Sequence, residues 1–347
     1  MSNNGEIMVR CQGLTKIYSE ITALDALDLE IPTGHIFGYI GHNGAGKTTT
    51  IRILAGLLTS SRGKATIAGV DVSSGRDRIK SLVGYMPDSF GVYDQMRCWE
   101  YLDFFGAAFK IPRKQRTKRI DFVLELTDAE YMRDRFVDTL SHGMKQRIGI
   151  ARTLMHDPSV LLLDEPANGL DPQARVQMRQ LIRKLADSGK TLLVSSHILP
   201  ELAQVCDEVG IIHKGKLKAA GPISQVLSQI KRDRLLETKA LNGSAAMIAF
   251  LSKHKQCHDV QAPEDSSGIV RFQFKGDDQA MAALLSSMHQ AGIAVVSFQE
   301  IPLSLEEAYL TISGISDQQT TEEDEKRRTA EARAELARRQ GKKVAAQ

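Results

Sequence analysis

The chain has 347 residues, of which 42% are apolar and 25% are charged, with a net charge of +3; this length suits two domains, and the near-balanced charge gives no argument for nucleic acid. The longest apolar runs, at 160–163 and 191–194, fall far short of the roughly 18 residues that a membrane span needs, and MSNNGEIMVR shows no apolar signal region, so we expect a protein of the cytoplasm or of a membrane's inner face. The scattered cysteines indicate reduced thiols rather than disulfides or a zinc site: Cys11, Cys98, Cys206 and Cys257.

The first part of the chain predicts strands and a glycine-rich loop. Alternating residues predict strands around 7–12 and 21–31. HIFGYIG is typical of a buried strand that enters a glycine-rich loop, and TTTIRILAGLL then predicts a helix. The stretch from about 95 to 157 is predicted to be mostly helical.

Strands and helices continue to alternate beyond this stretch. VLLLDEP and TLLVSSH predict buried strands, with a helix at QARVQMRQLIRKLADSG between them. EVGIIHKGKLKAAG predicts a hairpin that turns at Lys214–Gly215. This order indicates an α/β fold with a parallel-rich core and a helical insertion.

A different pattern begins near residue 222. Five segments predict strand, helix, strand, helix and strand, and 257–262 is compatible with a further strand. This order indicates a small α+β domain of ferredoxin-like type, followed by a short helix at SLEEAYLTIS. We therefore expect a core domain at 1–221, an accessory domain at 222–314, and a charged tail at 315–347 that is a solvated helix or disordered.

GHNGAGKT, residues 41–48, matches the phosphate-binding pattern G-x-x-x-x-G-K-[ST]. Its glycines let backbone amides close around phosphate oxygens, while Lys47 supplies a mobile positive charge and Thr48 a hydroxyl for Mg²⁺. The helix that follows directs its positive N-terminus at the same place. We predict that this loop binds the phosphates of a nucleotide through Gly41, His42, Asn43, Gly44, Ala45, Gly46, Lys47, Thr48 and Thr49.

Three polar residues follow the predicted buried strands. Asp164 at the end of VLLLD can hold Mg²⁺, and Glu165 is the natural general base for an attacking water. His197 follows TLLVSS and can hydrogen-bond the γ-phosphate or hold the water. Because the carboxyl ends of parallel strands carry ligands, we expect these residues to meet the glycine-rich loop.

LSHGMKQRIGIAR, 140–152, predicts a helix with Ser141 as its cap and Gly143 in its first turn. Such a helix start is a second anion site.

Five motifs in this order closely resemble the nucleotide-binding subunit of ABC transporters: GHNGAGKT, LSHGMKQR, VLLLDEP, NGLDP and SSH. The resemblance covers roughly residues 7–221 and implies a P-loop NTPase fold of the ABC ATPase type, with a helical subdomain at about 95–157. The accessory domain looks like that of the bacterial efflux branch, in which the ATPase works with separate membrane subunits. The resemblance thus implies an ATP-hydrolysing subunit of an exporter.

In that family two subunits face head to tail over two ATP molecules. The resemblance implies a homodimer, or a pair with a related ATPase subunit, in which Ser141 and Gly143 reach the γ-phosphate bound by the other subunit. Asp171 of NGLDP would cross the same interface. Tyr18 stands where the family often stacks an aromatic residue on adenine, with an ordinary strand aromatic as the alternative.

Two motifs depart from the family's pattern. Asp88 in GYMPD stands where the family usually has a glutamine that faces Mg²⁺ and senses the membrane partner, and LSHGM replaces LSGGQ through His142 and Met144. The site is either degenerate or a live variant, and we favour the live variant because a carboxylate is a good Mg²⁺ ligand. If Asp88 approaches Glu165, the like charges should raise the pKa of Glu165.

The resemblance implies a separate integral-membrane permease that contacts the chain near Asp88, Phe90 and Tyr93, whereas we expect Trp99 and Tyr101 in the core. It places the chain in the cytoplasm, peripheral on the inner face of the cell membrane. The alternatives are a non-transport ABC ATPase and a nucleotide-sensing regulatory subunit. We expect no nucleic-acid partner, because the basic tail is interleaved with acids and only one set of motifs is present.

Overall fold

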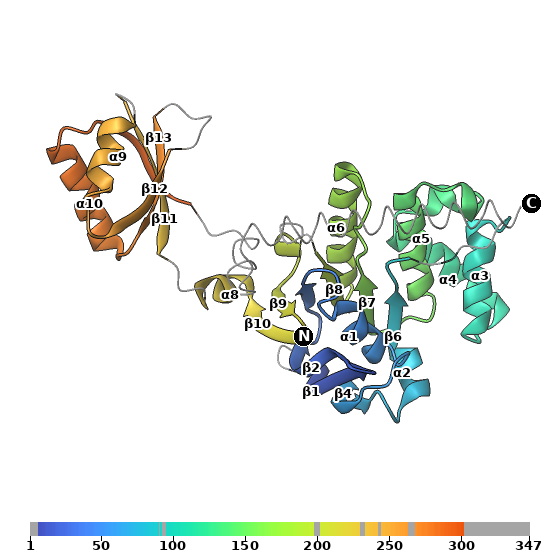
Figure 1. Cartoon of the computed structure of the whole chain (residues 1–347). Coiled ribbons are helices and arrows are strands. Elements are labelled where there is room, and N and C mark those ends of the chain that lie inside the picture. Colours follow the sequence, from blue (N-terminus) through green and yellow to red (C-terminus); the bar gives the residue numbers. More distant parts are fainter. Residues whose placement is uncertain are drawn as a thin grey trace, which may run out of the picture. The chain divides into compact units, whose positions relative to one another are not determined.

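The computed structural model describes residues 6–89, 91, 95–197, 202–229, 233–241, 244–262 and 268–301, with no side-chain detail at 227–229. The short helix expected at SLEEAYLTIS, the charged tail, Phe90 and Tyr93 lie outside these residues. The described residues fall into two compact units that separate after Val226 (Figure 1).

A six-stranded sheet forms the centre of the first unit, and all its strands are parallel except the antiparallel edge strand β10. In spatial order the strands are β10 (Lys216–Pro222), β9 (Glu208–His213), β3 (Ile36–Ile40), β8 (Thr191–Ser196), β7 (Val160–Asp164) and β6 (Val83–Met86). Every residue of β3, β7 and β8 is buried, which explains their near-continuous apolar sequences. The predicted α/β fold is confirmed.

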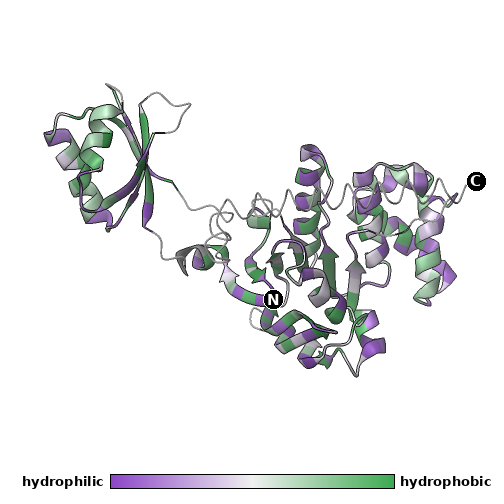
Figure 2. Cartoon of the chain, viewed as in Figure 1, coloured by the Kyte–Doolittle hydropathy of each residue, from purple (hydrophilic) through white to green (hydrophobic). Residues whose placement is uncertain are grey.

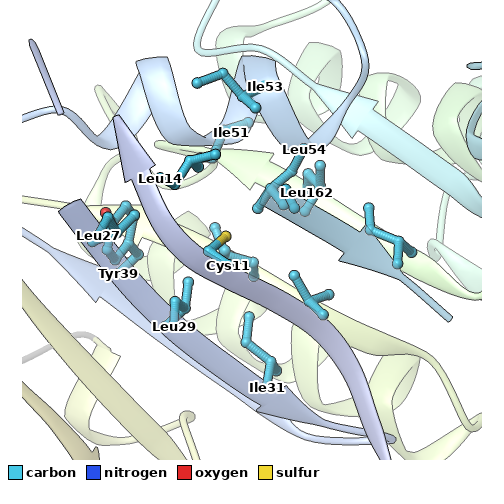
Figure 3. Close-up of a cluster of buried hydrophobic side chains, with 14 of the residues drawn as sticks. Cys11, Leu14, Leu27, Leu29, Ile31, Tyr39, Ile51, Ile53, Leu54 and Leu162 are labelled. Atoms are coloured by element: carbon cyan, nitrogen blue, oxygen red, sulfur yellow. The ribbon is translucent and has the colours of Figure 1, made fainter. Parts of the chain in front are cut away.

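A second, four-stranded antiparallel sheet packs against α1 (Lys47–Leu54). Its spatial order is β2 (Ile21–Pro32), β1 (Ile7–Tyr18), β4 (Arg62–Ile67) and β5 (Val70–Asp71). Figure 3 shows Ile51 and Leu54 of α1, Leu14 of β1 and Leu162 of β7 in one apolar cluster, which joins the two sheets through the helix. This packing fixes the start of α1, where the glycine-rich loop ends.

The predicted helical insertion lies between β6 and β7. It contains α3 (Cys98–Ala108), α4 (Arg113–Leu126), two short 3₁₀ turns (Glu130–Met132 and Val137–Thr139) and α5 (His142–Leu154). Tyr101 is fully buried as expected, whereas Trp99 is only partly buried, with the Arg133 guanidinium 6.0 Å from its ring centroid. The helices α2 (Arg76–Leu82) and α6 (Pro172–Asp187) belong to the central unit as well.

The hairpin between β9 and β10 turns at Lys214–Gly215, as predicted. Both residues have positive φ, 47° for Lys214 and 78° for Gly215, the pattern of a two-residue hairpin turn. The Gly215 N–H donates to the Ala45 carbonyl at 2.8 Å, so a hydrogen bond from the turn supports the glycine-rich loop.

The second unit begins within α8 (Ile223–Gln229), after Val226, and has the predicted ferredoxin-like order. The sequence of elements is β11 (Arg234–Ala240), α9 (Ala245–Leu251), β12 (Cys257–Gln261), β13 (Ile269–Phe274), α10 (Asp278–Gln290) and β14 (Val295–Glu300). The sheet order is β12-β13-β11-β14, with both helices on one face (Figure 1). The compatible strand at 257–262 is thus present as β12.

Apolar residues concentrate in the inner strands, while the outer helix faces are polar (Figure 2). Across the described ranges, every helix is too short or too polar to cross a membrane.

Candidate functional site

A cavity of about 510 Å³ lies at the carboxyl ends of the central parallel strands. It brings together the glycine-rich loop, Asp88, Glu165 and His197, as the motifs predict. The lining residues are Ala23, His42, Asn43, Gly44, Gly46, Lys47, Thr48, Thr49, Asp88, Glu165, Asn168 and His197. Gly41 and Ala45 belong to the loop but are buried.

Two glycines of the loop are required by their surroundings. A Cβ at Gly41 would lie 2.6 Å from the Ile212 carbonyl oxygen, and one at Gly46 would lie 2.8 Å from the Ala23 carbonyl oxygen. Gly46 also has φ 115°, a conformation that other residues rarely adopt. It is the N-cap of α1 and provides no capping side chain, so the amides at this helix start face the loop and suit an anion.

Lys47 is buried and folded back onto the loop. Its Nζ donates to the Gly41 carbonyl at 2.5 Å and to the His42 carbonyl at 3.3 Å. The same Nζ lies 3.2 Å from Oε1 of Glu165, which forms a nearly buried ion pair. The cation that the motif assigns to phosphate is therefore held by the residue that we predict to be the general base.

Asp164 lies behind the cavity wall and is 1% exposed. Burial raises the pKa of its carboxyl, while hydrogen bonds from Ser195 and Thr48 act in the opposite direction. The Ser195 hydroxyl donates to Oδ1 of Asp164 at 2.7 Å. A carboxylate beside the Thr48 hydroxyl offers the hard oxygen donors that Mg²⁺ prefers, so these two residues fit that ion.

Glu165 follows β7 with φ 52°, a left-handed conformation that strains a residue other than glycine. Its Oε2 accepts from Nδ1 of His197 at 2.8 Å. Burial alone would raise the pKa of Glu165, but the His197 hydrogen bond and the charge of Lys47 outweigh burial and lower it. Asp88 pairs with Asn168 instead, so the condition for the upward shift that we expected from Asp88 is not met in this structure.

Asp88 instead contacts Asn168, a residue of NGLDP for which the motifs predict no role. The Asn168 amide donates to Oδ1 of Asp88 at 3.1 Å, and the Asn168 carbonyl lies 2.9 Å from Nε2 of His142. Two of the three residues that depart from the family's pattern, Asp88 and His142, thus contact one loop residue. The sequence does not reveal that Asp88 and His142 share Asn168 as a neighbour, because these three residues are far apart in the chain.

The start of α5 lines a separate cavity of about 320 Å³. Ser141 caps the helix by accepting from the Met144 N–H at 3.4 Å, which confirms its predicted capping role. Gly143 and Asp171 line the same cavity, and Asp171 caps α6 by accepting from the Ala174 N–H at 2.8 Å. Within one chain these residues face a different space from the glycine-rich loop.

Tyr18 ends β1 with an exposed ring, and the Lys16 ammonium lies 5.0 Å from its centroid. It lies outside the set of residues that line the phosphate-loop cavity.

A further cavity, of about 970 Å³, lies between α2, the end of α3, α4 and the end of α5, and we call it the insertion groove. It combines apolar and basic side chains with two acidic ones; among them are Ile111, Phe109, Phe122, Met155, Lys80, Lys110, Lys118, Arg119, Asp77 and Asp157. The Phe109 ring stacks on His156 at a centroid distance of 3.9 Å. The exposed rings of Phe109 and Phe122 make this a surface that suits an apolar partner.

Comparison with known proteins agrees with the geometry. Residues 24–168 match the family described as ABC transporter. The chain is 35% identical over 309 residues to the bacitracin transport ATP-binding protein BcrA of Bacillus licheniformis, covering 88% of this chain and 97% of that protein. It is 32% identical over 306 residues to the Nod factor export ATP-binding protein I of Ralstonia nicotianae, covering 87% and 92% respectively.

Among solved structures, the chain is similar to CbiO1 from Clostridium perfringens, which is described as part of the ABC transporter complex CbiONQ. The TM-score is 0.60 at 27% identity, covering 65% of this chain and 92% of that chain.

Proposed function

This chain belongs to the ABC transporter family as an ATP-binding and ATP-hydrolysing subunit, and from this we propose that it drives export through a separate membrane permease. The single observation that carries the proposal is the cavity in which Lys47, Glu165 and His197 face one another at the ends of parallel strands. The name of the Nod factor export protein supports export as the direction, and the name of BcrA supports transport, because the similarity to both extends over almost their whole length.

The glycine-rich loop would bind the ATP phosphates through its amides and Lys47, and Tyr18 would stack on adenine. Thr48 and Asp164 would hold Mg²⁺, and Asp88 would add a carboxylate on the other side of the cavity. When bound, the ion neutralises part of the negative charge on the phosphate oxygens. The hydroxyl and carboxylate oxygens that converge here support this assignment.

Glu165 would act as the general base and His197 would orient the attacking water. In the present structure Lys47 and His197 occupy both carboxylate oxygens of Glu165. When phosphate takes over Lys47, the Glu165 carboxylate loses a neighbouring cation and becomes a stronger base. The basicity of Glu165 would thus rise only when ATP is bound, so Glu165 would be a weak base in the empty site.

A second copy of the chain, or a closely related subunit, would complete the site. Ser141 and Gly143 line a cavity that is distinct from the phosphate-loop cavity, so they would act on ATP bound by the other copy. Asp171 would cross the same interface while it caps α6.

The permease would contact the loop after β6, near Asp88, and the insertion groove would offer it a second surface. Exposed Phe109 and Phe122 together with Lys110 and Lys118 suit a short amphipathic segment that carries acidic residues. This arrangement would keep the chain at the cytoplasmic face of the cell membrane, where Asp88 and Asn168 connect the partner to the nucleotide site.

Phosphate release from Mg²⁺-ATP tests the catalytic assignment. We expect Glu165→Gln to reduce kcat by at least about 100-fold while ATP binding is kept, because the base is lost and the loop is not. Glu208→Gln is the matched control, since Glu208 lies at the start of β9 beside His35. Full activity of the Glu165 variant would remove Glu165 from the role of general base.

A further inference from the structure

The strand β8 carries a serine at the point where the two acidic residues of the site lie. Ser195 is the neighbour of Asp164 in the parallel ladder between β7 and β8, and it is completely buried. The sequence motifs assign it no role.

The Ser195 hydroxyl makes two hydrogen bonds, one to each acidic residue. It donates to Oδ1 of Asp164 at 2.7 Å and accepts from the backbone N–H of Glu165 at 3.0 Å. A hydroxyl has one donor and two acceptor positions, so a single group can serve both. An alanine or valine at this position would serve neither.

The conformation of Glu165 explains why such a group is needed. With φ 52°, Glu165 leaves the regular strand, and its N–H is directed to a side chain of β8. The two neighbouring carboxylates then diverge. Asp164 is held next to Thr48, while Glu165 meets Lys47 and His197.

We propose that Ser195 is a positioning residue for ATP hydrolysis, whose hydroxyl holds the Asp164 carboxylate and the Glu165 backbone in a fixed relation. One carboxylate thereby faces the divalent cation and the other faces the attacking water. The proposal rests on the proposed function of this site. Ser195 itself lies outside the set of residues that line the phosphate-loop cavity.

The competing explanation is that the hydroxyl only stabilises the fold, and β8 offers a matched control for it. Thr191, at the other end of the strand, is also completely buried, and its Oγ1 accepts from the Gly34 N–H at 2.8 Å. Thr191→Val removes a buried hydroxyl from the same strand far from the acidic residues.

The test uses the full chain with Mn²⁺ in place of Mg²⁺, and electron paramagnetic resonance to measure free Mn²⁺ in the presence of ATP. For Ser195→Ala we expect a loss of roughly 10-fold or more in Mn²⁺ affinity and in kcat, the range seen when the partner of a metal ligand is removed. ATP affinity in EDTA should stay within about twofold, because the loop amides and Lys47 are unchanged. Ser195→Thr, which keeps the hydroxyl, should restore both Mn²⁺ affinity and kcat.

The proposal is overturned if Ser195→Ala lowers the melting temperature as Thr191→Val does but keeps Mn²⁺ affinity and kcat. Should Ser195→Ala fail to fold, Ser195→Cys keeps the volume with much weaker hydrogen bonds and carries the same expectations. A wild-type chain that releases no phosphate would instead refute the proposed function, which separates the two failures.

Discussion

Glu165 is restrained at the scale of single atoms, since Lys47 holds one carboxylate oxygen and His197 the other. These contacts keep its pKa low in spite of burial. A base of low pKa is a weak base, so the arrangement describes a resting site. Exchange of Lys47 from carboxylate to phosphate is the residue-scale event that would start the reaction.

Asp88 gives a second residue-scale prediction. Because its carboxylate binds Asn168 and not Glu165, we expect Asp88→Asn to leave the acid limb of the pH–rate profile in place. An asparagine oxygen can still accept from Asn168, so kcat should change by less than about tenfold. The measurement is kcat from pH 5 to pH 9, and a downward shift of the acid limb would mean that Asp88 does act on the base.

Asp157 tests the electrostatics of the fold away from the site. The Lys190 hydrogen bond, aided by Arg119, lowers the pKa of Asp157. Its stabilising contribution is therefore present above the unfolded pKa of about 3.9 and is lost as the pH falls through the folded pKa. Because Asp157 is largely exposed, Asp157→Asn should cost only about 0.5–1 kcal/mol at neutral pH.

The measurement is the melting temperature of Asp157→Asn and of the wild type, near pH 7 and near pH 3. The difference between the two melting temperatures should be smaller at the lower pH. Glu20→Gln, in the exposed turn after β1, is the control. A difference that is equal at both pH values would show that lost packing, and not charge, is responsible.

Residues of the site differ in how well the sequence predicts them. Lys47, Asp164 and His197 belong to contiguous motifs that follow buried strands, so their convergence follows from a parallel sheet. Asn168 and Ser195 escape prediction because their partners are distant in sequence and adjacent only through strand register and loop conformation.

At the scale of elements, the fully buried strands were the most predictable. β3, β7 and β8 are continuous apolar runs because both faces of their sheet are covered. By contrast, β4 has three exposed residues before its first buried one. β1 extends six residues past its predicted end at residue 12, and the added part is partly exposed. Pairing with neighbouring strands, not an apolar pattern, determines these elements.

The β9–β10 turn gives an element-scale prediction. A Cβ at Gly215 would lie 2.8 Å from the Ala23 carbonyl, and the Gly215 N–H supports Ala45 of the glycine-rich loop. Gly215→Ala should therefore weaken ATP binding by about tenfold, although the turn does not line the cavity.

Gly189→Ala is the matched control for backbone strain. Gly189 has a similar φ of 88°, but a Cβ there meets nothing within 4 Å. This variant should lose about 1 kcal/mol of stability and keep its ATP affinity. Calorimetric titration with ATP measures the ATP affinity of the Gly215 and Gly189 variants. Equal affinities for the two variants would show that the turn does not support the loop.

At the scale of the whole molecule, the proposed two-copy site would draw on two separate cavities of each chain. The phosphate-loop cavity holds Lys47 and Glu165, and the smaller cavity holds Ser141 and Gly143. A head-to-tail pair of chains would bring one of each kind together at each ATP. The strands of the accessory unit could be predicted from their alternating pattern. Its helices cover only one face of the sheet, so every second strand residue is buried and apolar.

The most direct test of this account is the mass of the Glu165→Gln chain in solution, measured by light scattering with and without Mg²⁺-ATP. The substitution removes the proposed base and keeps the proposed binding groups, so a closed pair should accumulate, and the mass should double only when Mg²⁺-ATP is present. Ser141→Arg in the same background should prevent the doubling, because a long charged side chain would fill the smaller cavity. A chain that binds ATP at the glycine-rich loop and keeps the mass of a monomer would contradict the proposed two-copy site.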